Sequence, residues 1–130
     1  MKYIRKYNES LTKSFDEKDI EHFFAHTFDL CESYVINDDV FFNPDNNEWA
    51  NNDFSNPDSE YHPDRCDKGF SISLHHDFYD VVEDVKDFKK YVQILNELES
   101  DLDRFIETYN PKYLEFCLNT DSIMQIIIRP

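Results

Sequence analysis

Apolar residues in the first third of the chain recur at the spacing of a helix. The sequence Ser14-Phe15-Asp16-Glu17 has the form of a capping box, in which a Ser side chain caps the helix and a Glu three residues later bonds back. The side chains that follow at steps of three and four are Ile20, Phe23, Phe24, Thr27, Cys31 and Tyr34. Because this spacing places them on one face, the pattern predicts an amphipathic helix over residues 15–35.

Residues 69–76 alternate between apolar and polar side chains. Phe70, Ile72 and Leu74 are separated by serines, and a histidine follows. A period of two is typical of a strand with one buried face. We therefore expect a strand here, opened by Gly69, the only glycine of the chain.

The clearest helical pattern covers residues 81–109. Its apolar residues recur at steps of four and three: Val81, Val85, Phe88, Val92, Leu95, Leu98, Leu102, Phe105 and Tyr109. Asp80 and Glu83 are placed as a second capping pair, and Asn110-Pro111 stops the helix. The sequence thus predicts one long amphipathic helix.

Two β-prone runs close the chain. Residues 112–118 and 123–129 are joined by Asn119-Thr120-Asp121-Ser122, whose turn chemistry predicts an antiparallel hairpin. The second run is almost continuously apolar, which predicts a central strand covered on both faces. The first seven residues alternate and favour a further strand. We expect a single α+β domain over 1–130, with a small antiparallel sheet and its C-terminal hairpin packed against two amphipathic helices.

Residues 36–69 show neither period. Turn-forming residues arrive in four clusters, Asn43-Pro44-Asp45-Asn46-Asn47, Asn51-Asn52-Asp53, Asn56-Pro57-Asp58 and His62-Pro63-Asp64. The pattern predicts a long acidic loop rich in Asn, Asp and Pro. A loop of this length is unusual inside a compact domain, so its aromatic residues either pin it to the body of the protein or contact a partner, and pinning is favoured. These aromatic residues are Phe41, Phe42, Trp49, Phe54 and Tyr61.

The chain carries 28 Asp and Glu against 13 Lys and Arg, a formal charge of −15. The excess is concentrated in residues 16–67, where 15 acids face only two bases, whereas residues 1–13 contain four bases and one acid. Solubility alone needs a charge of magnitude about 2 to 8. A strongly acidic domain attracts basic proteins and repels nucleic acid, so we expect a basic protein partner and no direct nucleic-acid binding.

The remaining composition indicates a cytoplasmic protein. No apolar run approaches the roughly 20 residues needed to span a bilayer, and the first residues lack the apolar core of a signal peptide. Three widely separated cysteines suit a reducing compartment better than a disulfide framework. We expect no membrane association.

The motifs of catalysis and cofactor binding are largely missing. One glycine excludes the Gly-rich loops that cradle ATP or NAD phosphates, and neither a Gly-x-Ser-x-Gly elbow nor a His-Glu-x-x-His helix is present. His22 and His26 have a spacing that can share a metal, but two ligands do not make a site. Calcium-type oxygen ligands occur in Asp45-Asn46-Asn47-Glu48 and in Asp58-Ser59-Glu60, but both segments lack the glycine and distant Glu of a calcium loop. We expect no enzyme, no cofactor and no metal.

Acidic residues also recur along the long helix. Glu97 with Asp101, and Glu99 with Asp103 and Glu107, are four residues apart, which is about 6 Å and close to the phosphate spacing of a nucleic-acid strand. The simpler interpretation is a solvated helix face. Together with the loop, they give a predicted partner-binding set of Asp45, Glu48, Trp49, Asp53, Phe54, Asp58, Glu60, Glu97, Glu99, Asp101, Asp103 and Glu107.

These features favour an acidic inhibitor that blocks a basic nucleic-acid-processing protein. One form is a bacterial immunity protein that neutralises a toxin, and the alternative is a phage anti-restriction or anti-CRISPR mimic of nucleic acid. Aromatic residues interleaved with the acids, such as Trp49 and Phe54, favour the immunity protein, because they suit one specific interface. A third hypothesis is a structural or adaptor subunit whose acidity serves solubility, and its binding would survive high salt.

Overall fold

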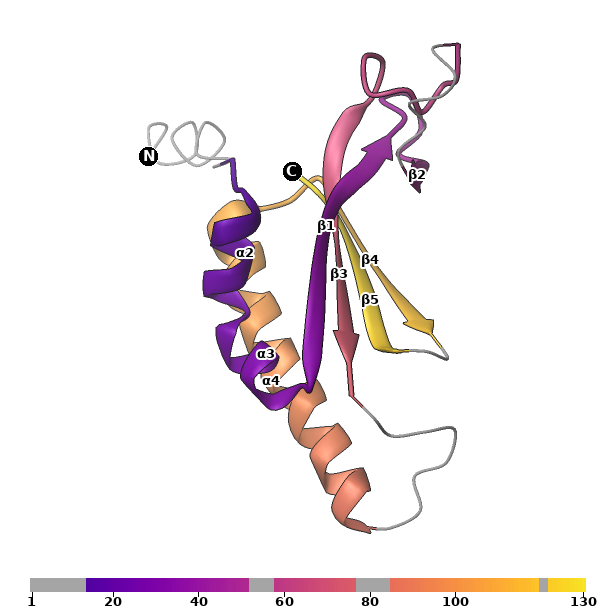
Figure 1. The fold of residues 1–130 in the computed structure, drawn as a ribbon. Helices are drawn as coiled ribbons and strands as arrows, with labels where there is room; N and C mark the ends of the chain where they lie inside the picture. Colours follow the sequence, from indigo (N-terminus) through magenta and orange to yellow (C-terminus); the bar gives the residue numbers. More distant parts are fainter. Residues whose placement is uncertain (1–13, 52–57, 77–84, 120–121) are drawn as a thin grey trace, which may run out of the picture.

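The described residues form a five-stranded antiparallel sheet with helices packed on one face (Figure 1). The computed structural model describes residues 14–51, 58–76, 85–119 and 122–130. In chain order the elements are α2 (Glu17–Phe23), α3 (Ala25–Leu30), β1 (Ser33–Phe42), β2 (Trp49–Asn51), β3 (Asp67–His75), α4 (Val85–Tyr109), β4 (Tyr113–Asn119) and β5 (Ser122–Arg129). The expected α+β class with a C-terminal hairpin is confirmed. The strand expected in the first seven residues lies outside the described part.

The strands lie in the order β2-β1-β3-β5-β4, and every neighbouring pair is antiparallel. β5 is therefore flanked by two strands. Its residues Ile126, Ile127 and Ile128 are all fully buried. Ile126 and Ile128 join the core beneath the helices, whereas Ile127 joins a smaller cluster with Val40 and Phe42 on the other face. The expected central strand, covered on both faces, is confirmed.

The helix expected over 15–35 is wrong in its length and continuity. α2 and α3 are separated at Phe24, whose φ of −100° and ψ of 14° depart from helical values, and α3 ends at Leu30. The cap is also displaced, because Asp16 rather than Ser14 accepts a hydrogen bond from the backbone N–H of Asp19, at 3.0 Å. The first helical layer is thus two short helices.

The last part of that predicted helix is the start of β1. Ser33 pairs with His75 of β3, and the ladder continues through Tyr34 opposite Leu74. The ring of Tyr34 stacks on Phe28 of α3, with ring centroids 3.8 Å apart. Long-range pairing with β3 outweighs the local helical spacing, because Tyr, Val and Ile are good strand formers on a half-buried surface.

The loop expected over 36–69 is wrong at both ends. β1 continues through Phe42, a short strand β2 follows the next turn, and β3 already begins at Asp67. The sequence concealed β1 because the ladder to β3 shifts register between Asn37 and Val40, which interrupts the period of two. Part of the predicted loop, residues 52–57, lies outside the described residues.

The later elements follow the sequence closely. β3 contains the expected strand, with Gly69 inside it rather than at its start. α4 is continuous from Val85 to Tyr109, while residues 80–84, with the predicted capping pair, lie outside the described part. The helix ends at Asn110, whose φ of 45° is left-handed and whose N–H donates to the Ile106 carbonyl oxygen at 2.8 Å.

α4 attaches the helical layer to the sheet through a buried aromatic cluster. The ring of Phe105 is fully buried, and its centroid lies 4.9 Å from that of Phe15 and 5.4 Å from that of Phe24. Phe15 in turn contacts Phe70 of β3 at 5.6 Å. Such edge-on and tilted pairs stabilise a core beyond the area they bury. They fix one flank of α4 against α2 and α3.

Gly69 permits the ring of Phe42 to cross β3, and Gly69→Ala tests this packing. A Cβ at Gly69 would lie 2.2 Å from Cε2 of Phe42 and 2.6 Å from the carbonyl oxygen of Ile128. We expect the substitution to lower the free energy of unfolding by about 2 to 3 kcal/mol, measured by urea denaturation, because the ring must move. Ser73→Ala on the same strand is the control, and equal stability of both variants would contradict the packing.

Candidate partner-binding surfaces

Three carboxylates form a row on the outer side of α4. Glu99, Asp103 and Glu107 are all exposed. Successive members are four residues apart, so they follow one another along the helix at a rise of about 6 Å. Like charges at this spacing repel each other by a few tenths of a kcal/mol, roughly, and a cationic partner relieves that repulsion. We call these three residues the α4 acidic row.

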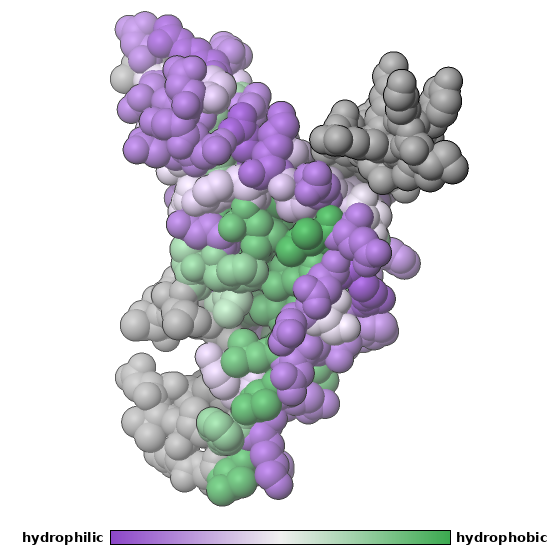
Figure 2. All heavy atoms as spheres, turned by 180° about the vertical axis from the view of Figure 1, so that it is seen from behind, coloured by the Kyte–Doolittle hydropathy of each residue, from purple (hydrophilic) through white to green (hydrophobic). Residues whose placement is uncertain are grey.

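The α4 acidic row borders an apolar groove between α4 and the β4–β5 hairpin. The groove has a volume of about 420 Å³, and its apolar lining consists of Leu95, Leu98, Leu102, Ile106, Phe116 and Met124. Among the described lining residues, only Glu99 and Asp103 are charged. Figure 2 shows the apolar patch beside the hydrophilic outer side of α4. We call it the hairpin groove, and it is absent from the predicted set.

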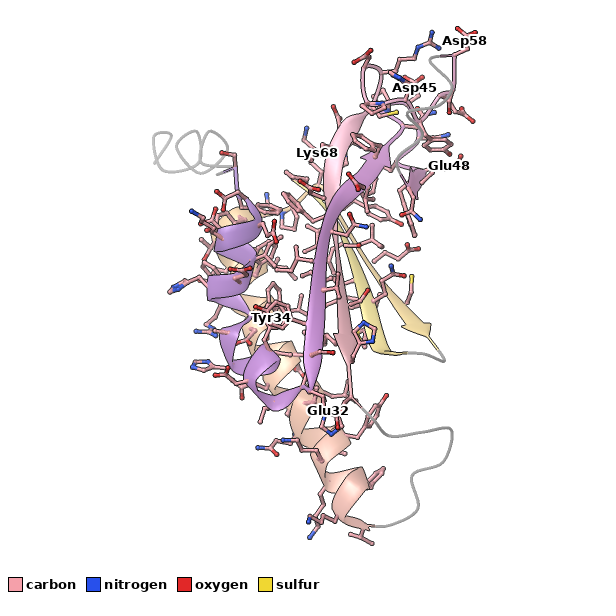
Figure 3. The ribbon with its side chains drawn as sticks, in the orientation of Figure 1. Glu32, Tyr34, Asp45, Glu48, Asp58 and Lys68 are labelled. Atoms are coloured by element: carbon pink, nitrogen blue, oxygen red, sulfur yellow. The ribbon has the colours of Figure 1, made fainter. Side chains whose placement is uncertain are left out.

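The described loop acids of the predicted partner-binding set lie in the segments that join β1 to β2 and β2 to β3. Asp45, Glu48 and Asp58 are exposed at the end of the sheet that extends beyond the helical layer (Figure 3). The predicted contact residues Asp53 and Phe54 lie outside the described part of the chain. The structure therefore gathers this loop group at one end of the molecule.

Two of the loop carboxylates, those of Glu48 and Glu60, accept side-chain hydrogen bonds. Oε2 of Glu48 accepts from the hydroxyl of Tyr61 at 3.1 Å, and Oε2 of Glu60 accepts from Nδ2 of Asn43 at 3.2 Å. Partial burial, together with the bond to Glu48, raises the pKa of Tyr61, so its hydroxyl remains a donor at neutral pH. These bonds hold both carboxylates in fixed positions.

Trp49 forms one wall of a second concave site. Its side chain packs against the cluster of Val40, Phe42 and Ile127, and its Nε1 donates to Oε2 of Glu115 at 2.8 Å. The site has a volume of about 410 Å³ and is lined by Asn46, Asn47, Glu48, Trp49, Tyr61, Tyr113 and Glu115. We call it the tryptophan pocket. These contacts indicate that Trp49 holds the predicted loop against the body of the protein, which is the favoured alternative to contact with a partner.

The two concave sites open on opposite faces of the sheet. Glu115 lines the tryptophan pocket, and the next residue of β4, Phe116, lines the hairpin groove. Adjacent side chains of a strand point to opposite faces. The loop acids and the α4 acidic row therefore lie on two separate surfaces. A single interface that includes the whole predicted partner-binding set would need them on one surface.

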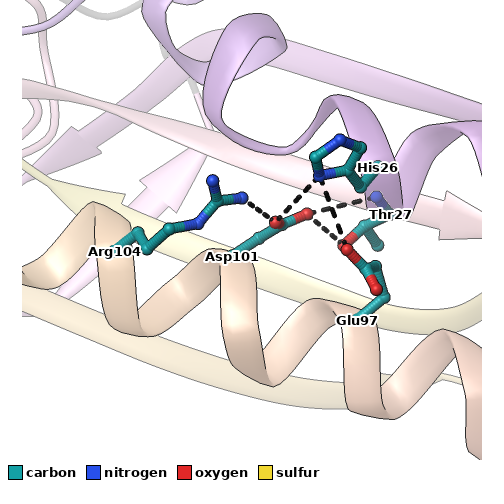
Figure 4. Close-up of polar contacts among 5 residues, drawn as sticks. All are labelled: His26, Thr27, Glu97, Asp101 and Arg104. Atoms are coloured by element: carbon teal, nitrogen blue, oxygen red, sulfur yellow. Dashed lines mark hydrogen bonds and ion pairs between the residues drawn. The ribbon is translucent and has the colours of Figure 1, made fainter.

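Asp101 is not a surface residue, which corrects the expected pair of Glu97 with Asp101. Its side chain is fully buried between α3 and α4 (Figure 4). Oδ2 accepts from the backbone N–H of Thr27 at 3.1 Å and from its hydroxyl at 2.7 Å, while Arg104 pairs with Oδ1. Acids four residues apart look alike in sequence whether or not another helix covers one of them.

His26 completes this cluster at the surface. Its Nδ1 lies 3.5 Å from Oε1 of Glu97 and 3.9 Å from Oδ1 of Asp101, and the three groups could share one ion. Arg104 already pairs with Asp101, however, so a metal would have to displace a guanidinium. His22 lies on α2, across the break from His26 on α3. The cluster is accounted for by the Arg104–Asp101 ion pair within α4 and by the hydrogen bonds of Thr27, which join α3 to α4.

The three cysteines are poor candidates for nucleophiles. Burial raises the pKa of Cys31, Cys66 and Cys117, and the nearby carboxylates of Asp67 and Glu115 raise the pKa values of Cys66 and Cys117 further. A reactive cysteine needs the opposite shift, because the thiolate is the nucleophile. The thiols therefore remain protonated at neutral pH.

Comparison with protein-family models, curated proteins and solved structures found no match for this chain. Each helix of the described residues is too short or too polar to cross a bilayer. The function of the protein must therefore be inferred from its own residues and their arrangement.

Asp101→Asn tests the junction between α3 and α4. The change removes the charge that Arg104 pairs with and sets an amide against the donors of Thr27. We expect the free energy of unfolding to fall by about 3 kcal/mol, measured by urea denaturation. Asp103→Asn makes the same chemical change at an exposed position and should stay within about 0.5 kcal/mol of wild type. Equal effects at both positions would contradict a structural role for Asp101.

Trp49→Ala and Trp49→Phe separate pinning from partner contact. Because Trp49 packs on a buried cluster and bonds Glu115, we expect Trp49→Ala to lower the free energy of unfolding by about 2 to 3 kcal/mol. Trp49→Phe keeps most of the packing and loses only the hydrogen bond, so it should cost about 1 kcal/mol. Thermal melts report both values. If Trp49→Ala melts like wild type, the ring is not a pin.

Proposed function

We propose that this chain is a cytoplasmic inhibitor that binds and blocks a basic nucleic-acid-processing protein, and that it acts as the immunity protein of a nuclease toxin. The observation that carries the proposal is the α4 acidic row of Glu99, Asp103 and Glu107 beside the apolar hairpin groove. Exposed carboxylates supply attraction to a basic surface, and the groove supplies apolar area to bury on contact.

The overall charge supports the same conclusion. A formal charge of −15 raises the rate of encounter with a basic protein, which matters for an inhibitor that must capture a toxin before it acts. The tryptophan pocket offers a second anchor, because Glu48, Tyr61 and Glu115 surround a space that can accept a Lys or Arg side chain. Inhibition then follows from covering the surface that binds nucleic acid.

A phage-encoded anti-restriction or anti-CRISPR protein is the alternative with the same electrostatics. The α4 acidic row has a spacing close to that of phosphates along a strand, which favours this alternative. Its carboxylates, however, lie beside an apolar groove rather than along an extended polar surface. Apolar anchors suit one cognate partner, so we place the immunity protein first.

A structural or adaptor subunit is the third candidate function. It is favoured by the exposure of two large apolar side chains at the groove, Ile106 at 41% and Phe116 at 48%. Exposed apolar patches of this kind also mark subunit interfaces. An assembly of that type would be held by burial and would resist salt, whereas an inhibitor complex should associate more slowly as ionic strength rises.

The proposal is tested by neutralising the α4 acidic row. A tagged protein is used to capture its partner from lysate of the source organism and related strains, and the captured protein is assayed for nuclease activity. The variant Glu99→Gln, Asp103→Asn, Glu107→Gln should inhibit that nuclease at least about tenfold more weakly, with an unchanged melting temperature, since all three residues are exposed.

The matched control removes three carboxylates elsewhere. Glu21→Gln, Asp29→Asn, Asp39→Asn changes the net charge equally at exposed positions of α2, α3 and β1. It should retain inhibition within about threefold. Equal inhibition by both triple variants would remove the α4 acidic row from the interface. A salt-resistant assembly without nuclease activity would support the structural subunit instead.

A further inference from the structure

Among the described residues, helices α2 and α3 cover only one flank of α4, and the hairpin groove lies on the other flank. On the covered flank, Asp101 bonds Thr27 of α3, and the ring of Phe105 lies 5.4 Å from that of Phe24. The other flank faces the hairpin, and Ile106 on that flank remains 41% exposed. In the described part of the chain, the helical layer therefore ends at α4, although apolar side chains continue beyond it on β4 and β5.

The part of the sheet that forms the floor of the groove is also partly exposed. Ile126 of β5 is fully buried under α4, while its register partner Phe116 on β4 is 48% exposed. Both side chains point to the helical side of the sheet, since they are paired across neighbouring strands. Met124 of β5 completes the floor. The position above β4 is thus the place that a further helix would occupy in a two-layer fold.

The dimensions of the groove fit a short helix. Its lining on α4 extends from Leu95 to Ile106, which corresponds to about 17 Å of helix axis. About eleven residues of a second helix cover that length, and helices in contact lie about 8 to 10 Å apart. The apolar stripe continues toward the start of α4 through Val92, which is 37% exposed. Three turns of an amphipathic helix match this surface.

Charge selects what kind of helix can enter. The described lining contains the carboxylates of Glu99 and Asp103 and no Lys or Arg. A second copy of this chain would bring another formal charge of −15 to the same place, so self-association is disfavoured. A helix with Lys or Arg along the edges of its apolar face would pair with these carboxylates as its apolar residues enter the groove.

We propose that the hairpin groove binds a basic amphipathic helix of the partner protein, with apolar residues at i, i+3 or i+4 and i+7 and cationic residues beside Glu99 and Asp103. This inference rests on the proposed function in so far as the helix belongs to the inhibited protein. Phe116 and Ile106 are the apolar contacts that desolvate on binding, and they should contribute most of the affinity.

The direct test uses a synthetic probe and the full-length chain. The probe is a fluorescein-labelled peptide of about fourteen residues, made of Leu and Lys in an order that gives one apolar helical face. Its binding is followed by fluorescence anisotropy. A peptide of the same composition in scrambled order should bind at least about tenfold more weakly, because it presents charge without an apolar face.

Substitutions in the groove locate the site. Ile106→Ser and Phe116→Ser should each weaken binding of the ordered peptide about tenfold, with little effect on folding, because both side chains are already partly exposed. Val35→Ser is the matched control, since Val35 is 53% exposed on β1 and does not line the groove. Equal binding by all three variants would overturn the proposal, and so would equal binding of the scrambled peptide.

Two other occupants would also overturn it. If a second copy fills the groove, sedimentation will show a dimer that Phe116→Ser dissociates. If residues 1–13 fill it, Ile4→Ser, Leu11→Ser in the full chain will raise the affinity for the peptide by several fold, roughly, since a competing segment loses apolar side chains at an unchanged net charge.

The outcome for the groove can be separated from that for the proposed function. If Phe116→Ser abolishes peptide binding but leaves nuclease inhibition unchanged, the inhibitor stands and its interface lies elsewhere, which overturns the groove as the partner site. If Phe116→Ser abolishes peptide binding and the captured partner is not a nucleic-acid-processing protein, the helix-binding groove stands and the inhibitor proposal fails.

Discussion

The buried carboxylate of Asp101 determines how the helical layer is assembled. It accepts two hydrogen bonds from Thr27 of α3 and pairs with Arg104 of its own helix, so α3 can dock on only one flank of α4. A buried charge is costly to desolvate and adds little net stability, but it penalises any arrangement that leaves it unpaired. The contacts of Phe105 with Phe15 and Phe24 further stabilise this arrangement of the helices.

The flank of α4 on which α3 does not dock carries both charged and apolar side chains. Electrostatic attraction and apolar burial therefore act at one surface. The exposed carboxylates of Glu99 and Asp103 act over the Debye length, about 8 to 10 Å, and therefore govern encounter. The apolar side chains of Ile106 and Phe116 act only on contact and govern how long a complex lasts. The proposed inhibitor needs both, because a toxin must be found quickly and released slowly.

Two cations, Arg129 and Lys68, form ion pairs that join strands of the sheet. Arg129 is buried, lies over the ring of Phe42 and pairs with Asp67, and Lys68 contacts Asp38 at 3.0 Å. These pairs join β1, β3 and β5 at the end of the sheet that carries the loop acids. Asp38 and Asp67 are therefore paired within the protein, whereas Asp45 and Glu48 are exposed at the same end of the sheet.

The sequence by itself determined β3 and α4, because their apolar period is uninterrupted, and the C-terminal hairpin, because turn-forming residues join two β-prone runs. It also determined the net charge and the four-residue spacing of Glu99, Asp103 and Glu107. Only the tertiary structure decided that residues 33–42 pair with β3 and that Asp101 is buried while Asp103 is exposed. Strand pairing and side-chain burial depend on residues that are distant in the chain. The local spacing of apolar and acidic residues does not show which distant residues will contact them. The hairpin groove likewise depends on the tertiary structure, because its lining comes from α4, β4 and β5.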